Sequence, residues 1–171
     1  RGDGAWVEAP GNWVEFVSLG KGRLTPVPAE FPDGDYQKIR FRIGVDPRTD
    51  QQDPSAYSPS HPLHPDLCGL HWSWQGGYIY MAVEGTTSKP VNGGGGFSFH
   101  LAREGNAPMV ELPLRISGSG TSNVRIAMDV PAILSGINFQ RDGNSTHSRT
   151  GDPIPARMKE NLLNSFTLLS V

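Results

Sequence analysis

The sequence predicts a mainly β fold: a single antiparallel β-sandwich-like domain over residues 1–171, with long irregular loops and a short C-terminal helix. Short segments of alternating apolar and polar residues are typical of strands with one buried face. Glycine and proline, at 21 and 15 of 171 residues, favour many turns over long helices. A chain of this length buries enough surface to fold without disulfides. Its single cysteine, Cys68, excludes an intrachain disulfide.

Six segments are expected to be strands because their apolar residues recur at every second position. These segments are residues 13–19, 39–45, 78–84, 97–101, 110–116 and 124–130. Proline has no N–H to give to a strand ladder, so Pro113 predicts an edge strand or a bulge. Four stretches lack any periodicity and are expected to be irregular loops: residues 20–35, 46–70, 85–96 and 139–152.

Helical signals are few and concentrate at the C-terminal end. Asp152 followed by proline is typical of a capped helix start, and Met158, Leu162 and Phe166 recur every four residues. This spacing predicts an amphipathic helix of about three turns. A single short turn is expected over residues 131–134.

Charge and motifs exclude several classes of function. Lysine plus arginine total 15 and aspartate plus glutamate 17, a net charge of -2, which argues against a basic nucleic-acid-binding surface. No apolar run approaches the length of a membrane span. The chain lacks the Gly-x-Ser-x-Gly elbow of many serine hydrolases, and its glycine run at 93–96 lacks the Lys-Ser/Thr of a phosphate-binding loop.

Metal-binding side chains gather in one short segment. His61, His64, Cys68 and His71 fall within eleven residues, and Trp72 follows at once. Imidazole suits zinc and copper, and thiolate suits zinc and Cu(I). The spacing of the four residues could wrap one tetrahedral zinc ion. The alternative is that these histidines only solvate a proline-rich turn.

A further histidine is placed by strand alternation. Phe97, Phe99 and Leu101 are expected to face the core, so His100 faces away from it. On spacing alone His100 could equally be an ordinary surface residue.

Several motifs together resemble one known family, and the tryptophan motif is the most specific of them. The motifs are Phe41-Arg-Ile-Gly-Val-Asp46, Leu70-His-Trp-Ser-Trp-Gln-Gly-Gly-Tyr78 continuing through Glu84-Gly85, Phe97-Ser-Phe-His100, Ile126-Ala-Met-Asp129 and His147-Ser148. This pattern resembles the MbnP-like copper-binding proteins over most of the chain from about residue 40. Within that family it looks most like the MopE/CorA group of copper-repressible surface and secreted proteins of methanotrophic bacteria.

The resemblance implies an exported, non-catalytic protein for copper acquisition or delivery, in the periplasm, at the outer cell surface or secreted. It implies one Cu(I) ion held by His64, His100 and the aniline nitrogen of kynurenine formed by oxidation of Trp72. An unmodified indole has no free in-plane lone pair and would be a poor ligand. A di-haem peroxidase-like partner is implied for that oxidation, as is peripheral outer-surface association without a transmembrane segment. Many family members carry four cysteines, whereas this chain has only Cys68.

Further roles stay open at this point. Asp66 is a candidate to fix the tautomer of His64 through a hydrogen bond. Trp74 and His147 are further candidates near the expected site. The remaining alternative is a carbohydrate- or protein-binding β-sandwich module in which four aromatic residues form a stacking platform. These are Trp72, Trp74, Tyr78 and Tyr80.

Overall fold

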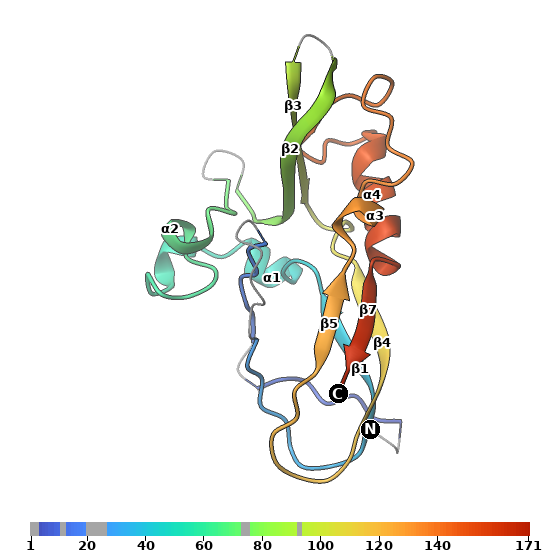
Figure 1. Ribbon diagram of the computed structural model, residues 1–171. Coiled ribbons are helices and arrows are strands. Elements are labelled where there is room, and N and C mark those ends of the chain that lie inside the picture. The colour runs from blue at the N-terminus through green and yellow to red at the C-terminus, as the bar shows by residue number, and fades with distance from the viewer. Residues whose placement is uncertain (1–3, 11–12, 20–26, 73–75, 92–93) are drawn as a thin grey trace.

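The computed structural model describes residues 4–10, 13–19, 27–72, 76–91 and 94–171 and is mainly β (Figure 1). The strands are β1 (Tyr36–Arg42), β2 (Ile79–Val91), β3 (Gly94–Ala102), β4 (Met109–Ile116), β5 (Arg125–Met128), β6 (Ser145–Thr146) and β7 (Phe166–Ser170). The helices are α1 (Pro47–Asp50), the 3-10 turn η1 (Pro54–Ala56), α2 (Pro65–Cys68), α3 (Val130–Ile133) and α4 (Pro153–Leu163). The predicted β-sandwich-like class with a short C-terminal helix agrees with this arrangement.

The strands form three small sheets. β1 pairs with β4, β5 pairs with β7, and β2, β3 and β6 form a three-stranded sheet in that order. Three of these pairings are antiparallel, whereas β6 runs parallel to β3. The long β2–β3 hairpin extends at the top of Figure 1, and α3 and α4 lie along one side of the molecule. The predicted antiparallel arrangement thus holds for three of the four pairings, and β6 adds one short parallel pairing.

The main core lies between α4 and the sheets. The helix begins at the N-cap Asp152, whose side chain accepts a hydrogen bond from the backbone N–H of Ile154 at 3.0 Å. Its apolar face contributes Ile154, Met158 and Leu162, all nearly inaccessible to solvent. These side chains join three others that are fully buried: Phe99, Leu101 and Ile133. Helix α4 thus supports β3, the strand that carries His100.

Most of the predicted elements are confirmed. β1, β4 and β5 fall within or beside the segments that alternate, and α3 forms the expected short turn after the N-cap Asp129. Pro113 pairs with Lys38 in a two-stranded sheet, beside a register shift between Tyr36 and Lys38. Its edge position means that the missing N–H disrupts no inner ladder.

Three predictions are wrong. Residues 13–19 form no strand. The stretch 85–96 is not a loop, because β2 continues to Val91 and β3 begins at Gly94. Gly85 lies within the strand, opposite Phe97. The position needs glycine because a Cβ there would come within 2.9 Å of the Phe97 ring. The helix ends at Leu163, and Phe166 starts β7 instead of forming the next helical turn.

Candidate metal centre

Trp72 is held by a tight turn that leads into β2. Its backbone N–H donates to the carbonyl of Gly77 at 3.1 Å, and its own carbonyl accepts from Gly76 N–H at 2.8 Å. Gly76 and Gly77 have φ of 67° and 88°, a left-handed conformation that favours glycine. The turn packs the Trp72 side chain, 8% exposed, into a cluster with Ile79 and Ala102.

His100 faces this indole from β3. Its neighbours Phe99 and Leu101 are both fully buried in the core, so the alternation of the strand turns His100 to the opposite face. The centroid of the His100 ring lies 6.1 Å from that of Trp72. The predicted orientation of His100 is confirmed, and two of the predicted site residues lie together.

His147 completes the cluster. The parallel pairing of β3 with β6 sets Phe99 opposite Thr146, so that the next residues along the two segments are neighbours. The rings of His100 and His147 are 5.3 Å apart, and that of His147 is 5.7 Å from Trp72. We call these three side chains, Trp72, His100 and His147, the histidine–tryptophan pocket.

Ser148 fixes the backbone beside His147 to β3. Its hydroxyl donates to the carbonyl of His100 at 2.9 Å and accepts from the N–H of Ala102 at 2.9 Å. Its own N–H donates to Oγ1 of Thr146 at 3.0 Å. Ser148 has φ of 54°, uncommon for a residue other than glycine, and its side chain is buried. These bonds clamp the segment that presents His147 against the strand that presents His100.

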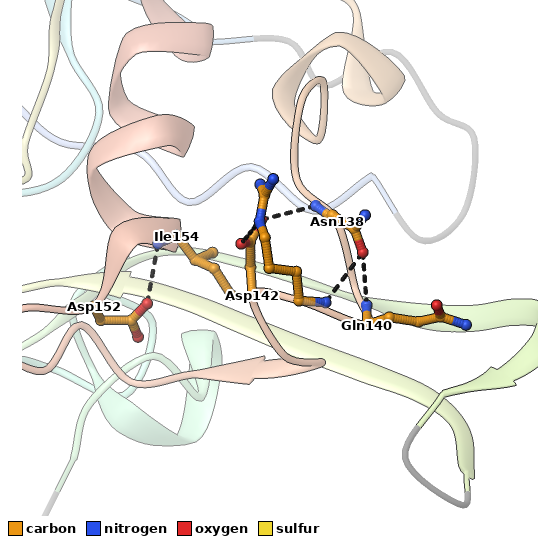
Figure 2. A network of polar contacts seen from close by, with 6 residues as sticks. Asn138, Gln140, Asp142, Asp152 and Ile154 are labelled. Atoms are coloured by element: carbon orange, nitrogen blue, oxygen red, sulfur yellow. Dashed lines mark hydrogen bonds and ion pairs between the residues drawn. The ribbon is translucent and has the colours of Figure 1, made fainter.

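The loop around His147 is also fixed at both ends (Figure 2). Before β6, the side chain of Asn138 accepts from the N–H of Gln140 at 3.0 Å, and Asn138 N–H donates to Asp142 at 2.9 Å. After His147, Asp152 caps α4 and accepts a further hydrogen bond from the Thr146 hydroxyl. Side-chain bonds to nearby backbone groups of this kind stabilise turns. The predicted loop over 139–152 therefore contains the two-residue strand β6 and is otherwise irregular but well bonded.

The two nitrogens of the His100 ring have different surroundings. Nε2 lies 2.8 Å from Oε1 of Glu84 and 3.1 Å from the hydroxyl of Ser98. The hydrogen bond from His100, and secondly that from Ser98, lowers the pKa of Glu84. Nδ1 is buried and has no hydrogen-bond partner within the described part of the chain. A buried nitrogen left in this state is unusual and fits a ligand site whose ion is not part of the polypeptide.

His64 lies elsewhere, as the N-cap of α2. Its Nδ1 accepts a hydrogen bond from the N–H of Asp66 at 3.2 Å, and the Asp66 carboxylate is 3.8 Å from the same nitrogen. In Figure 1, α2 stands apart from the β2–β3 hairpin. Among the described residues, no three His, Cys, Asp or Glu side chains are close enough together to hold one metal ion. The structure thus brings Trp72 and His100 together, whereas Nδ1 of His64 is occupied by the cap of α2.

The four residues of the alternative zinc site are all described and do not converge. Nδ1 of His61 accepts from the N–H of Leu63 at 3.1 Å. His71 packs edge-on against Tyr78 with a centroid distance of 4.9 Å. Sγ of Cys68 accepts from the N–H of Leu70 at 3.4 Å. Each of these groups has a local structural role.

The aromatic platform is not supported by the burial of its residues. Trp72, Tyr78 and Tyr80 are 8%, 3% and 8% exposed, and buried rings cannot stack on a sugar at the surface. Trp74, the fourth member, lies outside the described residues. The open space beside this region is a cleft of about 370 Å³, which Trp72, Gly77, Ala102 and Arg103 help to line. It gives a path from solvent to the otherwise buried indole.

Comparison with known proteins identifies one family. The family model described as MbnP matches residues 2–148, most of the chain and all three residues of the histidine–tryptophan pocket. Neither a curated protein nor a solved structure matches the chain. Within the described residues, the helices are too short to cross a bilayer.

Proposed function

Because the chain belongs to the MbnP family, which is associated with copper, we propose that it is an exported, non-catalytic protein that binds Cu(I) for acquisition or delivery. The observation that carries the proposal is Nδ1 of His100, buried without a partner beside the rings of Trp72 and His147. Neutral imidazole is a good copper ligand, and a bound ion would satisfy this nitrogen.

Two imidazoles and one tryptophan provide the donor groups that copper needs. His100 and His147 supply the imidazoles whose rings are already adjacent, 5.3 Å apart between centroids. Trp72 supplies the third donor once its indole has been opened to kynurenine. The oxidant for that conversion comes from outside the chain, and the proposed source is a di-haem peroxidase-like partner. The chain contributes the turn and the cleft that hold the indole within reach of solvent.

The family resemblance implies a different second imidazole. In that version of the site, His64 takes the place of His147 beside His100. A neutral imidazole has one acceptor nitrogen, and that of His64 bonds to the N–H of Asp66. Binding copper through this atom would break the cap of α2. The ring contact between His147 and His100, together with the occupied Nδ1 of His64, therefore favours His147 as the partner of His100.

Copper titration of four variants tests the site. Cu(I) affinity would be measured by competition with a chromogenic chelator for the parent, His100→Ala, His147→Ala and His64→Ala. His61→Ala serves as a matched histidine control, because its ring stacks on Tyr57 away from the pocket. Loss of a hydrogen-bond partner of a metal ligand typically weakens metal binding 10- to 100-fold, so loss of a ligand itself in His100→Ala or His147→Ala should weaken it by about 100-fold or more.

Either of two results would contradict the proposal. If the parent binds no copper, the function is wrong. If His147→Ala binds normally while His64→Ala does not, the copper-binding function stands and the ligand pair is His64 with His100. Intact mass of protein from its natural source, beside protein made without the partner, tests the oxidation of Trp72. Cell fractionation of the natural source tests export.

A further inference from the structure

The outward side of the His100 ring is held by two polar side chains of the same sheet. Glu84 lies on β2 and pairs across the ladder with Ser98, two residues before His100 on β3. The Ser98 hydroxyl donates to Oε1 of Glu84 at 3.0 Å, and the same oxygen lies 2.8 Å from Nε2 of His100. Three side chains on one face of a two-stranded ladder thus form a closed triangle of hydrogen bonds.

The direction of these bonds follows from the chemistry of the partners. An ionised carboxylate only accepts hydrogen bonds, so the contact with Glu84 requires a proton on Nε2. Ser98 gives its own proton to Glu84, and its oxygen is then available to accept from Nε2 as well. A proton on Nδ1 instead would bring lone pairs of Nε2 and Glu84 together at 2.8 Å. It would also bury an N–H donor without an acceptor, which is unfavourable.

We propose that Glu84 is a positioning residue that holds His100 in the Nε2–H tautomer and thereby presents the Nδ1 lone pair to the metal ion. The inference rests on the proposed function and adds to it the ligating atom and the residue that selects it. Carboxylates that accept from the far nitrogen of a metal-bound histidine are a general device for fixing ring orientation and raising ligand basicity. The Glu84 side chain is 61% exposed, so little packing holds it in place. The hydrogen bond from the Ser98 hydroxyl restricts its rotamers.

The tautomer can be read directly in metal-free protein. Histidine nitrogens labelled with ¹⁵N would be correlated with the ring carbon-bound protons by NMR, at a pH well above the ordinary histidine pKa of about 6.5. We expect His100 of the parent to show a protonated Nε2 and an unprotonated Nδ1. In Glu84→Ala the two forms should mix. In Glu84→Gln the amide oxygen can still accept, so the parent pattern should be partly restored.

The same variants would be titrated with Cu(I). Loss of such a hydrogen-bonded carboxylate typically weakens metal binding 10- to 100-fold, so Glu84→Ala should fall in about this range and Glu84→Gln should lie between it and the parent. Glu111→Ala is the matched control. Glu111 is likewise a strand carboxylate with a side-chain partner, Lys38 at 2.6 Å, but it lies in a different sheet, on β4. It should leave both the tautomer and copper binding unchanged.

The outcomes separate this inference from the function it rests on. A parent His100 protonated on Nδ1 would overturn the inference whatever copper does. So would a Glu84→Ala protein with an unchanged tautomer and unchanged affinity. A parent that shows the expected tautomer but binds no copper would overturn the proposed function and the metal-presenting part of the inference, while the role of Glu84 in fixing the tautomer would be established.

Discussion

Two regions of the molecule contain adjacent histidines, and they use the imidazole ring in opposite ways. In the segment from His61 to His71, the Nδ1 atoms of His61 and His64 each accept a backbone N–H two residues further on. In the histidine–tryptophan pocket, Nε2 of His100 is bonded to Glu84, and Nδ1 is buried without a partner among the described residues. A neutral imidazole has a single acceptor nitrogen, so a ring that caps a turn has no lone pair left for a metal.

The difference arises from how each region is built. The bonds that occupy Nδ1 of His61 and of His64 are local and could form in a short peptide. The pocket instead needs β2, β3 and β6, which come from separate parts of the chain. A dense run of potential ligands therefore says less about a metal site than the partners of each nitrogen do.

The largest effect on stability is expected from a change at Ser148, whose hydrogen bonds hold the backbone beside His147 against β3. Ser148→Ala removes the acceptor of the buried Ala102 N–H and the donor to the His100 carbonyl. Leaving buried polar groups unpaired costs about 1–3 kcal/mol, so the free energy of unfolding in urea should fall by this amount. Copper affinity should fall as well, because the backbone that presents His147 is released.

Two further variants control for backbone strain and for loss of a hydroxyl in general. Ser148→Gly also lacks the hydroxyl but relieves the positive φ of 54°, so it should be less destabilised than Ser148→Ala. Ser60→Ala removes an exposed hydroxyl, 3.3 Å from that of Ser58, and should change the unfolding free energy by less than about 0.5 kcal/mol. Equal losses in Ser148→Ala and Ser60→Ala would mean that the clamp has no special importance.

A smaller effect is expected from His64. If its imidazole acts as a helix cap, His64→Ala should lower the unfolding free energy of metal-free protein by about 0.5–1 kcal/mol. His64→Asn should recover most of this loss, because its amide oxygen can accept from the N–H of Asp66. Urea denaturation of the two variants beside the parent measures the difference.

Copper titration of His64→Asn then tests the contrast itself. Asparagine can cap α2 but cannot replace imidazole as a copper ligand. Normal copper binding by a stably folded His64→Asn protein would support a structural role for the His61–His71 segment, without a copper ligand. A loss as large as that of His100→Ala would show that His64 leaves its capping bond to bind copper, and the contrast between the two regions would fail.

Sequence patterns predicted the parts of the fold that depend on near neighbours. The alternation at Phe97, Phe99 and Leu101 correctly turned His100 away from the core. The same reasoning failed where a residue serves a distant contact. Gly85 looks like a strand breaker, yet it lies within β2. Glycine is needed there because the ring of Phe97, on the paired strand, occupies the space that a side chain would need. Phe166 continues the four-residue spacing of α4, and only its pairing with Met128 reveals a strand.

The site was predicted in part for the same reason. The tryptophan motif and the strand alternation pointed to Trp72 and His100. His147 was only a candidate from sequence, because its approach to His100 depends on the parallel pairing of Ser98 with Ser145, far apart in the chain. Glu84 lies in the stretch that resembles the family, but no sequence pattern gave a reason to place it in the site. Its place opposite Ser98 in a ladder would have been visible had the glycine-rich stretch been recognised as paired strands.

The smallest effect concerns Tyr78, which connects the two regions. Its hydroxyl donates to the carbonyl of Leu63 at 2.9 Å, and Leu63 lies between His61 and His64 in the chain. Tyr78 itself immediately precedes β2. Burial is the main cause that raises the pKa of Tyr78 from 10.0 to about 12. The folded state thus prefers the neutral phenol, whereas the unfolded chain ionises at the ordinary value. The stabilisation is complete below about pH 10 and is lost as the pH rises towards 12.

A phenolate absorbance titration, run beside urea unfolding at each pH, measures this loss. Tyr78→Phe should be less stable than the parent near neutral pH by about 1 kcal/mol, the typical value of one hydrogen bond. The gap should narrow above about pH 10, because the variant has no phenol at this position to ionise. Tyr36→Phe is the control, since its hydroxyl bonds to Pro32 away from both regions. If the gap between parent and Tyr78→Phe stayed constant up to pH 12, burial would not hold the Tyr78 hydroxyl in its neutral form. The attachment of the His61–His71 segment to β2 would then be assigned to other contacts, such as the bond from Ile79 N–H to the Leu70 carbonyl at 2.8 Å.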